Sequence, residues 1–140
     1  MGFKYLEEGP TADLMVECWG ETLGEAFGNA AMAMFTAMTP LEGVERRVMR
    51  EFEVEGDDLG ALLFNFLDEL LYLHEIDLLA FSGFTVDVDE DALKLRAVVE
   101  GEPFDLDRHV RGIAIKAVTF HHMSIEKEGG LWKITVVLDT

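Results

Sequence analysis

The chain has 140 residues, with 28 acidic side chains against 11 basic ones, a formal net charge of −17 and a pI near 4.4. A protein that grips phosphates needs clustered Lys and Arg, so this composition excludes a simple nucleic-acid binder. Hydrophobic residues make up 49% of the chain, which excludes a disordered protein. We therefore expect one folded domain spanning residues 1–140.

The sequence lacks the features of a secreted or membrane protein. The one cysteine, Cys18, cannot form an internal disulfide, and the first residues lack the apolar run of a secretory signal. No uninterrupted apolar stretch approaches the ~20 residues of a membrane span. We therefore expect a cytoplasmic protein without membrane contact. Cys18 has no basic sequence neighbour to lower its pKa, which favours a buried structural thiol over a nucleophile.

The first predicted elements are a strand and a helix. Residues 14–19 have the pattern of a short strand. Thr22 and Glu25 have the spacing of a capping box, which marks the start of a helix with apolar residues at i, i+3, i+4 and i+7. Thr39-Pro40 ends this helix, because the residue before a proline is disfavoured in helical conformation.

A second strand and a second helix follow. Residues 44–55 alternate between apolar and charged side chains, which predicts a strand with one solvated face. Asp57 and Asp58 then cap a helix whose apolar positions cover so wide an arc that we expect it to be largely buried. Asp68 and Glu69 interrupt this apolar arc.

The second half of the chain predicts strands and a tight hairpin. Residues 82–88 and 92–100 form two strands around an acidic turn, and Gly129-Gly130 between alternating runs is a two-residue hairpin signal. A two-residue turn fixes which residues of the two flanking strands lie opposite each other. The predicted pairs are Glu128 with Leu131, Glu126 with Lys133, Ile125 with Ile134, Met123 with Val136, and Phe120 with Asp139. Taken together, the elements predict an α+β fold, a mainly antiparallel β-sheet sandwich with two principal α-helices.

Two local groups suggest metal sites and are better explained otherwise. His121 and His122 are neighbours on a predicted strand, so we expect their rings on opposite faces, where they cannot easily share one ion. Asp87, Asp89 and Asp91 imitate the start of a calcium loop. The glycine and the glutamate that such a loop requires at its sixth and twelfth positions are absent, which favours a solvated turn.

Four spaced segments form a pattern together with the acidic end of the chain. They are Thr11-Ala12-Asp13 with residues 20–27; residues 62–72; Gly101-Glu102-Pro103-Phe104-Asp105 with His109; and Ile115-Lys116-Ala117-Val118-Thr119-Phe120-His121, with Asp139 near the end. In this order, over nearly the whole chain, they resemble the archease family. The Lys-Ala-Val-Thr-aromatic-His run is the most specific part. One departure is Gly9-Pro10, which stands where the family usually has Glu-His, so any role of that family histidine is absent here.

The resemblance implies an accessory protein, and no enzyme, that activates a tRNA-splicing RNA ligase of the RtcB type. Archeases promote the guanylylation of the active-site histidine of that ligase, help it turn over and can widen its nucleotide use. The family binds a divalent cation, calcium in known members. On the matching positions of this sequence, the implied ligands are Asp13, Asp139 and Thr140.

The chemistry of these residues is compatible with that role. Two carboxylates with a chain-terminal carboxylate or carbonyl form an all-oxygen set that suits Ca²⁺, Mg²⁺ or Mn²⁺. Two like charges ~4 Å apart repel by on the order of 4 kcal/mol at an effective dielectric constant of 20, so their convergence is hard to explain without a metal. The alternative is that Asp139 and Thr140 form a frayed, hydrated tail.

Three more residues are candidates for contacts with a partner or with the metal ligands. Lys116 is the lysine of the matched run and can position an acidic partner surface or a phosphate, with a plain surface salt bridge as the alternative. Glu69 lies on an apolar helix, where a buried carboxylate requires a partner. His121 ends the matched run.

Two other functions stay open on the sequence. One is a metal-assisted phosphohydrolase that uses Asp13, Asp139 and a histidine. The other is an acidic, chaperone-like binding module that masks a basic surface of its partner. Turnover of nucleotide by the protein alone would distinguish the first from an activator, and a dispensable Asp13 would distinguish the second.

Overall fold

The structure, a computed structural model, describes residues 2–6 and 13–140. Gly9-Pro10 and Thr11-Ala12 of the sequence pattern therefore lie outside the described residues. A short 3-10 helix, η1, spans Leu41–Gly43. The other elements in chain order are β1 (Phe3–Leu6), β2 (Asp13–Gly20), α1 (Leu23–Met38), β3 (Val48–Glu55), α2 (Leu59–Asp77), β4 (Leu79–Asp89), β5 (Lys94–Pro103), β6 (Ala117–Glu128) and β7 (Leu131–Asp139).

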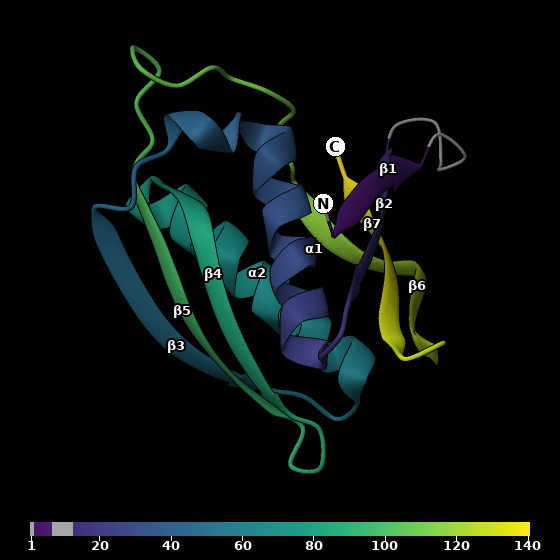
Figure 1. The fold of residues 1–140 in the computed structure, drawn as a ribbon. Coiled ribbons are helices and arrows are strands. Elements are labelled where there is room, and N and C mark those ends of the chain that lie inside the picture. Colours follow the sequence, from purple (N-terminus) through teal and green to yellow (C-terminus); the bar gives the residue numbers. More distant parts are fainter. Residues whose placement is uncertain (1, 7–12) are drawn as a thin grey trace.

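Two antiparallel sheets enclose the two helices (Figure 1). One sheet has the strand order β1-β2-β7-β6, and the other has the order β3-β5-β4. Helix α1 contacts β4 on one side and β1, β2 and β7 on the other, while α2 contacts β6 and all three strands of the smaller sheet. The prediction of an α+β sandwich with mainly antiparallel sheets and two principal helices is confirmed.

Both helices begin where the sequence predicted. The Thr22 hydroxyl accepts the main-chain N–H of Glu25 over 3.1 Å, and the Asp58 carboxylate accepts the N–H of Ala61 over 2.7 Å. These bonds satisfy N–H groups that lack a partner within the helix. Helix α1 ends at Thr39, whose extended backbone (φ −164°, ψ 145°) precedes Pro40.

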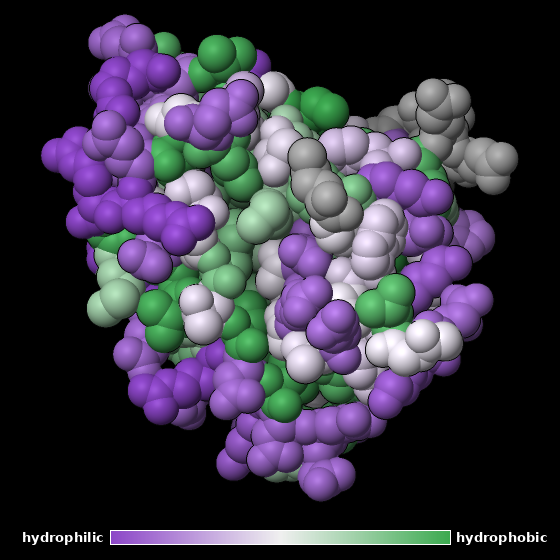
Figure 2. Space-filling model, viewed as in Figure 1, coloured by the Kyte–Doolittle hydropathy of each residue, from purple (hydrophilic) through white to green (hydrophobic). Residues whose placement is uncertain are grey.

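The core lies between the sheets and is rich in aromatic side chains. Phe27 of α1 stacks on Phe66 of α2 with ring centroids 6.3 Å apart. Helix α2 is less buried than predicted, because Tyr72 and Ile76 in its last two turns are 55% and 61% exposed. On the face drawn in Figure 2, hydrophilic side chains dominate the left and lower margins, and hydrophobic and hydrophilic ones are interspersed toward the middle. No helix among the described residues is long and apolar enough to cross a membrane.

Several strand boundaries differ from the prediction. Strand β3 begins at Val48, because η1 and an extended connection occupy residues 41–47. Arg47 belongs to that connection, where its main-chain N–H donates to the carbonyl of Gly101 over 2.8 Å. Strand β4 begins three residues before the predicted range and β5 ends three residues after it, because these two ends pair with each other.

The predicted hairpin forms between β6 and β7. Gly129 and Gly130 have φ values of +59° and +85°, which a two-residue type I′ turn requires at both positions. The pairs from Glu128 with Leu131 to Ser124 with Thr135 have the predicted register.

Further along β6 the predicted register is wrong. Ser124 lies opposite Thr135, and the next register pair is Thr119 with Val137. Residues 120–123 therefore form a four-residue bulge in β6. His122 in this bulge has a left-handed backbone with φ +55°. Such an insertion cannot be counted from the turn alone, because register arithmetic assumes an unbroken ladder.

The bulge corrects three specific expectations. Ala117, and not Phe120, lies opposite Asp139, and Met123 has no register partner in the described ladder. Phe120 instead stacks on Phe64 of α2 with ring centroids 4.5 Å apart, a tertiary contact that the hairpin pattern does not contain. The rings of His121 and His122 lie side by side, 4.1 Å between centroids, because alternation of faces holds only in a regular strand.

Candidate functional site

Asp13 and Asp139 lie opposite each other at one end of the four-stranded sheet. Asp13 is the first residue of β2, Asp139 is the last residue of β7, and the two are partners in the antiparallel register. Such directly opposed residues point to the same face of the sheet, with Cβ atoms about 4.5–5.5 Å apart. Both residues are half-buried. The fold thus brings together two carboxylates from opposite ends of the chain.

Strand β6 brings Lys116 to the same end of the sheet. The main-chain N–H of Lys116 donates to the carbonyl oxygen of Asp139 over 2.7 Å, and Ala117 is the register partner of Asp139. The Lys116 side chain is exposed, and Thr140, half-buried, directly follows Asp139. Four of the six candidate residues therefore gather at the ends of three adjacent strands.

The other two candidates lie elsewhere. Glu69 is half-buried on α2. His121 is exposed in the β6 bulge, and its main-chain N–H donates to the hydroxyl of Thr119 over 3.3 Å. Within the described ranges, no hydrogen bond or ion pair joins either residue to Asp13 or Asp139.

The donor atoms at this end of the sheet are all oxygens. The carboxylates of Asp13 and Asp139 and the oxygens of Thr140 are of the type that hard cations prefer. Like charges directly opposite each other destabilise a sheet, and in the part of the chain that the structure describes neither aspartate forms an ion pair. The described residues contain no group of three or more His, Cys, Asp or Glu side chains placed to hold a metal. A cation would therefore complete its ligand shell with the oxygens of Thr140 and with water.

Sequence reasoning missed a second charged cluster, centred on Glu102 near the end of β5. The Glu102 side chain is 1% exposed. Its Oε1 lies 2.7 Å from Nη1 of Arg108 and 3.6 Å from Nη1 of Arg47. Its Oε2 accepts the main-chain N–H of Glu45 over 2.8 Å and lies 3.0 Å from Nε2 of His109 and 3.3 Å from Nη2 of Arg108. We call these five residues the Glu102 cluster.

The electrostatics of this cluster favour the ionised carboxylate. The hydrogen bond from Arg108 contributes most, followed by that from the main chain of Glu45, and together with the bond from His109 they outweigh the effect of burial. They lower the pKa of Glu102 to about 2. A buried carboxylate held by this many donors stays charged at neutral pH.

The hydrogen bonds also fix the tautomer of His109. The main-chain N–H of Asp105 donates to Nδ1 over 2.9 Å, so Nδ1 carries no proton. The proton of the neutral ring is therefore on Nε2, which donates to Glu102. The ring also stacks on Phe104 with centroids 5.4 Å apart. Glu102 and His109 both lie in one matched segment of the sequence pattern, and this was the available signal for the cluster.

Residues 104–116 connect the two sheets, and we call them the strap. The strap leaves β5, crosses the end of the sandwich beside η1 and α1, and enters β6 at Ala117 (Figure 1). Its main-chain N–H groups donate to the helix ends at three points, each over 2.7 Å: Phe104 to Leu78, Gly112 to Met38 and Ile113 to Ala37. The Glu102 cluster holds the first part of the strap through Arg108 and His109. Lys116 is the last residue of the strap.

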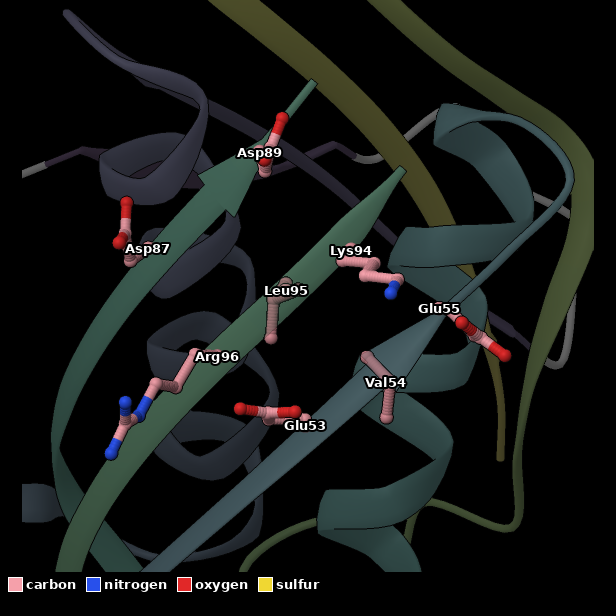
Figure 3. A pocket seen from close by; sticks show the side chains of 8 residues that line it. All are labelled: Glu53, Val54, Glu55, Asp87, Asp89, Lys94, Leu95 and Arg96. Carbon is pink, nitrogen blue, oxygen red and sulfur yellow. The ribbon is translucent and has the colours of Figure 1, made fainter. Parts of the chain in front are cut away.

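The outer face of the smaller sheet forms a different kind of cavity, of ≈ 390 Å³. Figure 3 shows Lys94 and Arg96 on the central strand β5, with carboxylates from β3 and β4 on either side. In the register, Arg96 lies between Glu53 and Asp87, and Arg96 also forms an ion pair with Glu51. Opposite charges across strands contribute about 0.2–1 kcal/mol per pair, so this face is stabilised by its own side chains.

Cys18 is a structural thiol, as predicted. It is fully buried in β2. Burial, with a smaller contribution from Glu17, raises its pKa to about 12. A thiol of that kind is protonated at neutral pH and is a poor nucleophile.

The comparisons with known proteins agree with the resemblance in the sequence. The model of the Archease protein family matches residues 3–140. The chain belongs to the archease family. Protein archease of Methanothermobacter thermautotrophicus is 41% identical over 140 residues, covering 99% of this chain and 98% of that protein. Protein archease of Sulfurisphaera tokodaii is 39% identical over 137 residues, covering 98% and 97%.

Solved structures have the same fold as this archease. The solution structure of protein 1598 of Methanobacterium thermoautotrophicum superposes with a TM-score of 0.80 at 39% identity, and 99% of each chain is covered. A crystal structure of an archease from Thermotoga maritima, described as a possible chaperone, has a TM-score of 0.64 at 20% identity, with 94% of this chain and 93% of that chain covered. That second likeness concerns the fold alone.

Proposed function

We propose that this archease is a metal-binding accessory protein that activates a tRNA-splicing RNA ligase of the RtcB type. In this role it promotes guanylylation of the ligase and helps the ligase turn over, and it can broaden the nucleotides that the ligase accepts. It performs no catalysis of its own. Its site of action is the cytoplasm, with the ligase.

The observation that carries the proposal is the juxtaposition of Asp13, Asp139 and Lys116. Asp13 is opposite Asp139 in the register, and Lys116 is hydrogen-bonded to the main chain of Asp139. The family resemblance implied Asp13 and Asp139 as cation ligands and Lys116 as a possible partner contact, and in the fold the three lie at one end of one sheet. A frayed tail is disfavoured, because Asp139 pairs with residues on both sides.

The proposed ligands of the cation are Asp13, Asp139 and Thr140. Two carboxylates with uncharged oxygens and water suit Ca²⁺, which accepts six to eight oxygen ligands in flexible geometry; Mn²⁺ and Mg²⁺ are alternatives. When bound, the cation would supply local positive charge on an otherwise acidic surface. Lys116, exposed beside it, would add a second positive group toward an acidic side chain or phosphate on the ligase.

The partner is a protein, and we expect no direct binding of RNA. The net charge of −17 opposes the approach of phosphates at physiological salt. An RNA ligase must itself hold RNA phosphates with Lys and Arg, so its surface is complementary to this acidic protein. Retardation of tRNA by the isolated protein would contradict this part of the proposal.

The test is a guanylylation assay of the ligase with labelled GTP, with and without this archease and Ca²⁺. We expect faster labelling and multiple turnover with the wild type, and loss of both with Asp13→Asn, Asp139→Asn and Lys116→Ala. Asp87→Asn is the matched control, because Asp87 is an exposed carboxylate on the other sheet. It should activate like the wild type.

The same assay distinguishes the alternatives. A metal-assisted phosphohydrolase would release phosphate from nucleotide or RNA without the ligase, and this release would stop in Asp13→Asn. A chaperone-like module would help only in stoichiometric amounts and would not need Asp13. Unchanged labelling of the ligase on adding wild-type protein would overturn the proposal.

A further inference from the structure

A groove of ≈ 340 Å³ opens between the end of α2 and the second half of the strap. Its apolar lining comes from Met38, Leu78, Phe104, Ile113 and Ile115. Leu78 and Ile113 are 62% and 46% exposed. Ile115 of this lining directly precedes Lys116, whose main-chain N–H donates to the carbonyl of Asp139, so the groove and the candidate site share the strap.

Leu78 is in an unusual conformation for its residue type. It is the C-cap of α2 and has a left-handed backbone, φ +56° and ψ +40°. Glycine or asparagine is the usual residue at such a position. Glycine has no Cβ to clash with the backbone, and the side chain of asparagine can form a local hydrogen bond that offsets the strain, which leucine cannot do. Here the strained residue is an exposed leucine. Strain of this kind persists only where the surrounding structure holds the backbone in place, and Leu78 differs from the other left-handed leucine, Leu93, in lining a groove.

The hydrogen bonds around Leu78 do not involve its side chain. The carbonyl of Leu78 accepts the N–H of Phe104 over 2.7 Å, and Nδ1 of His74 donates to the carbonyl of Leu79 over 2.8 Å. These bonds hold the helix end and the strap through main-chain groups and His74. The side chain of Leu78 is thus free to serve as contact surface.

The charges around the groove indicate the kind of partner. Glu75 lines it, and the neighbouring residues Asp77, Asp105 and Asp107 are exposed carboxylates on the same two segments. Arg111 lines the groove, and of the other two exposed cations on the strap, Arg108 pairs with the buried Glu102 and Lys116 lies at the strap's end. A fitting occupant is an apolar side chain flanked by Lys or Arg, on a protein with a basic surface. The RNA ligase of the proposed function has that chemistry, because it must bind phosphates.

We infer that the groove is the docking site for the ligase, with Leu78 and Ile113 as its apolar anchors. This inference rests on the proposed function and adds a surface to it. Docking here would place the ligase against Lys116 and the paired aspartates, since the strap leads from one to the other. An apolar centre with a polar rim is the usual anatomy of a protein interface.

The experiment measures the affinity of the ligase for the full-length archease by calorimetry, together with the thermal midpoint of each archease variant alone. Leu78→Asn removes the anchor and suits the left-handed backbone. We expect about a tenfold weaker affinity or more, with Tm equal to or about 3 °C above the wild type. Ile113→Asn should weaken the affinity similarly.

Leu93→Asn is the matched control. Leu93 also has a left-handed backbone, φ +54°, in the turn between β4 and β5, at the opposite end of the sandwich from the strap (Figure 1). Its substitution relieves the same strain without touching the groove. We expect a similar change in Tm and an unchanged affinity.

The outcomes separate this inference from the function on which it rests. If the wild type binds and activates the ligase and both groove variants do so equally well, the docking site is elsewhere and the inference is wrong. If the wild type neither binds nor activates, the proposed function fails, and this docking site with it. A concentration-dependent dimer of the wild type that Leu78→Asn disperses would make the occupant a second copy of this chain, which also overturns the inference.

Discussion

Two acidic sites of this protein differ in how their negative charge is compensated by neighbouring groups. Glu102 is a single carboxylate, 1% exposed, that lies within hydrogen-bonding or ion-pair distance of Arg108, His109, Arg47 and the main chain of Glu45. Asp13 and Asp139 are two half-buried carboxylates opposite each other, and within the described residues neither has an ion-pair partner. Within the described residues, the chain itself compensates the first site and does not compensate the second.

This difference indicates what each site is for. A buried charge surrounded by its own donors holds structure together, and its removal leaves those donors unsatisfied. Two opposed charges without a counter-charge weaken the sheet unless something binds between them. The comparison therefore marks Glu102 as a structural carboxylate and makes the paired aspartates candidates for binding a cation. Four measurements test it, in order of expected effect.

The largest effect is expected from Glu102→Gln. The change replaces the buried anion by a neutral amide and weakens every hydrogen bond that it accepts, while Arg108 and Arg47 are partly exposed and stay solvated. Because hydrogen bonds to a charged group contribute about 1.5–3 kcal/mol each and several weaken together, we expect a loss of about 3 kcal/mol or more of unfolding free energy. Urea denaturation measures it. Glu100→Gln, a half-buried residue two positions earlier on β5, is the control and should stay within about 0.5 kcal/mol of the wild type. Similar values for the two variants would remove the structural role of Glu102.

Calcium is expected to stabilise the wild type and not the aspartate variants. A ligand that binds only the native state adds about 2.7 kcal/mol when its concentration is 100 times Kd. Asp13→Asn and Asp139→Asn should each lose this gain, whereas Glu102→Gln should keep it. Thermal unfolding with Ca²⁺ and with a chelator provides the measurement. An equal gain in all the variants would place the cation elsewhere.

The stabilisation from Glu102 should disappear in acid. Its pKa is lowered from 4.5 to about 2 in the folded protein, so its contribution is full above pH 4.5 and falls as the pH drops toward 2. The difference in stability between the wild type and Glu102→Gln should therefore shrink across this window. Denaturation at intervals from pH 6 to pH 2 measures this, and a constant difference would contradict the lowered pKa.

The smallest effect has the opposite sign. In a chelator, Asp13→Asn relieves the repulsion of Asp139 and should raise the unfolding free energy by about 0.2–1 kcal/mol. Asp87→Asn is the contrasting control, because Asp87 lies opposite Arg96 and its neutralisation removes an attraction. It should lower stability by a similar amount. A loss of stability in metal-free Asp13→Asn would make Asp13 structural.

Local features of the fold were determined by the sequence. Thr22 and Asp58 cap the helices as predicted, and Gly129-Gly130 forms the predicted turn with the predicted register as far as Ser124. Each of these depends on residues a few positions apart, where backbone preference and capping dominate. The residues of the candidate cation site came from the family pattern, and the sequence alone could not show that they meet.

Tertiary structure decided how these pieces combine into a site. The bulge at residues 120–123, with Phe120 stacked on Phe64 of α2, shifts β6 so that Ala117 lies opposite Asp139 and Lys116 bonds to it. In the register that the turn predicted, Phe120 would stand there. The Glu102 cluster likewise joins Glu45 and Arg47 to the strap across the fold, through contacts that no local pattern contains. Long-range packing determines both the bulge in β6 and the Glu102 cluster. The insertion of a bulge and the burial of a charge depend on the side chains that pack against them from other elements.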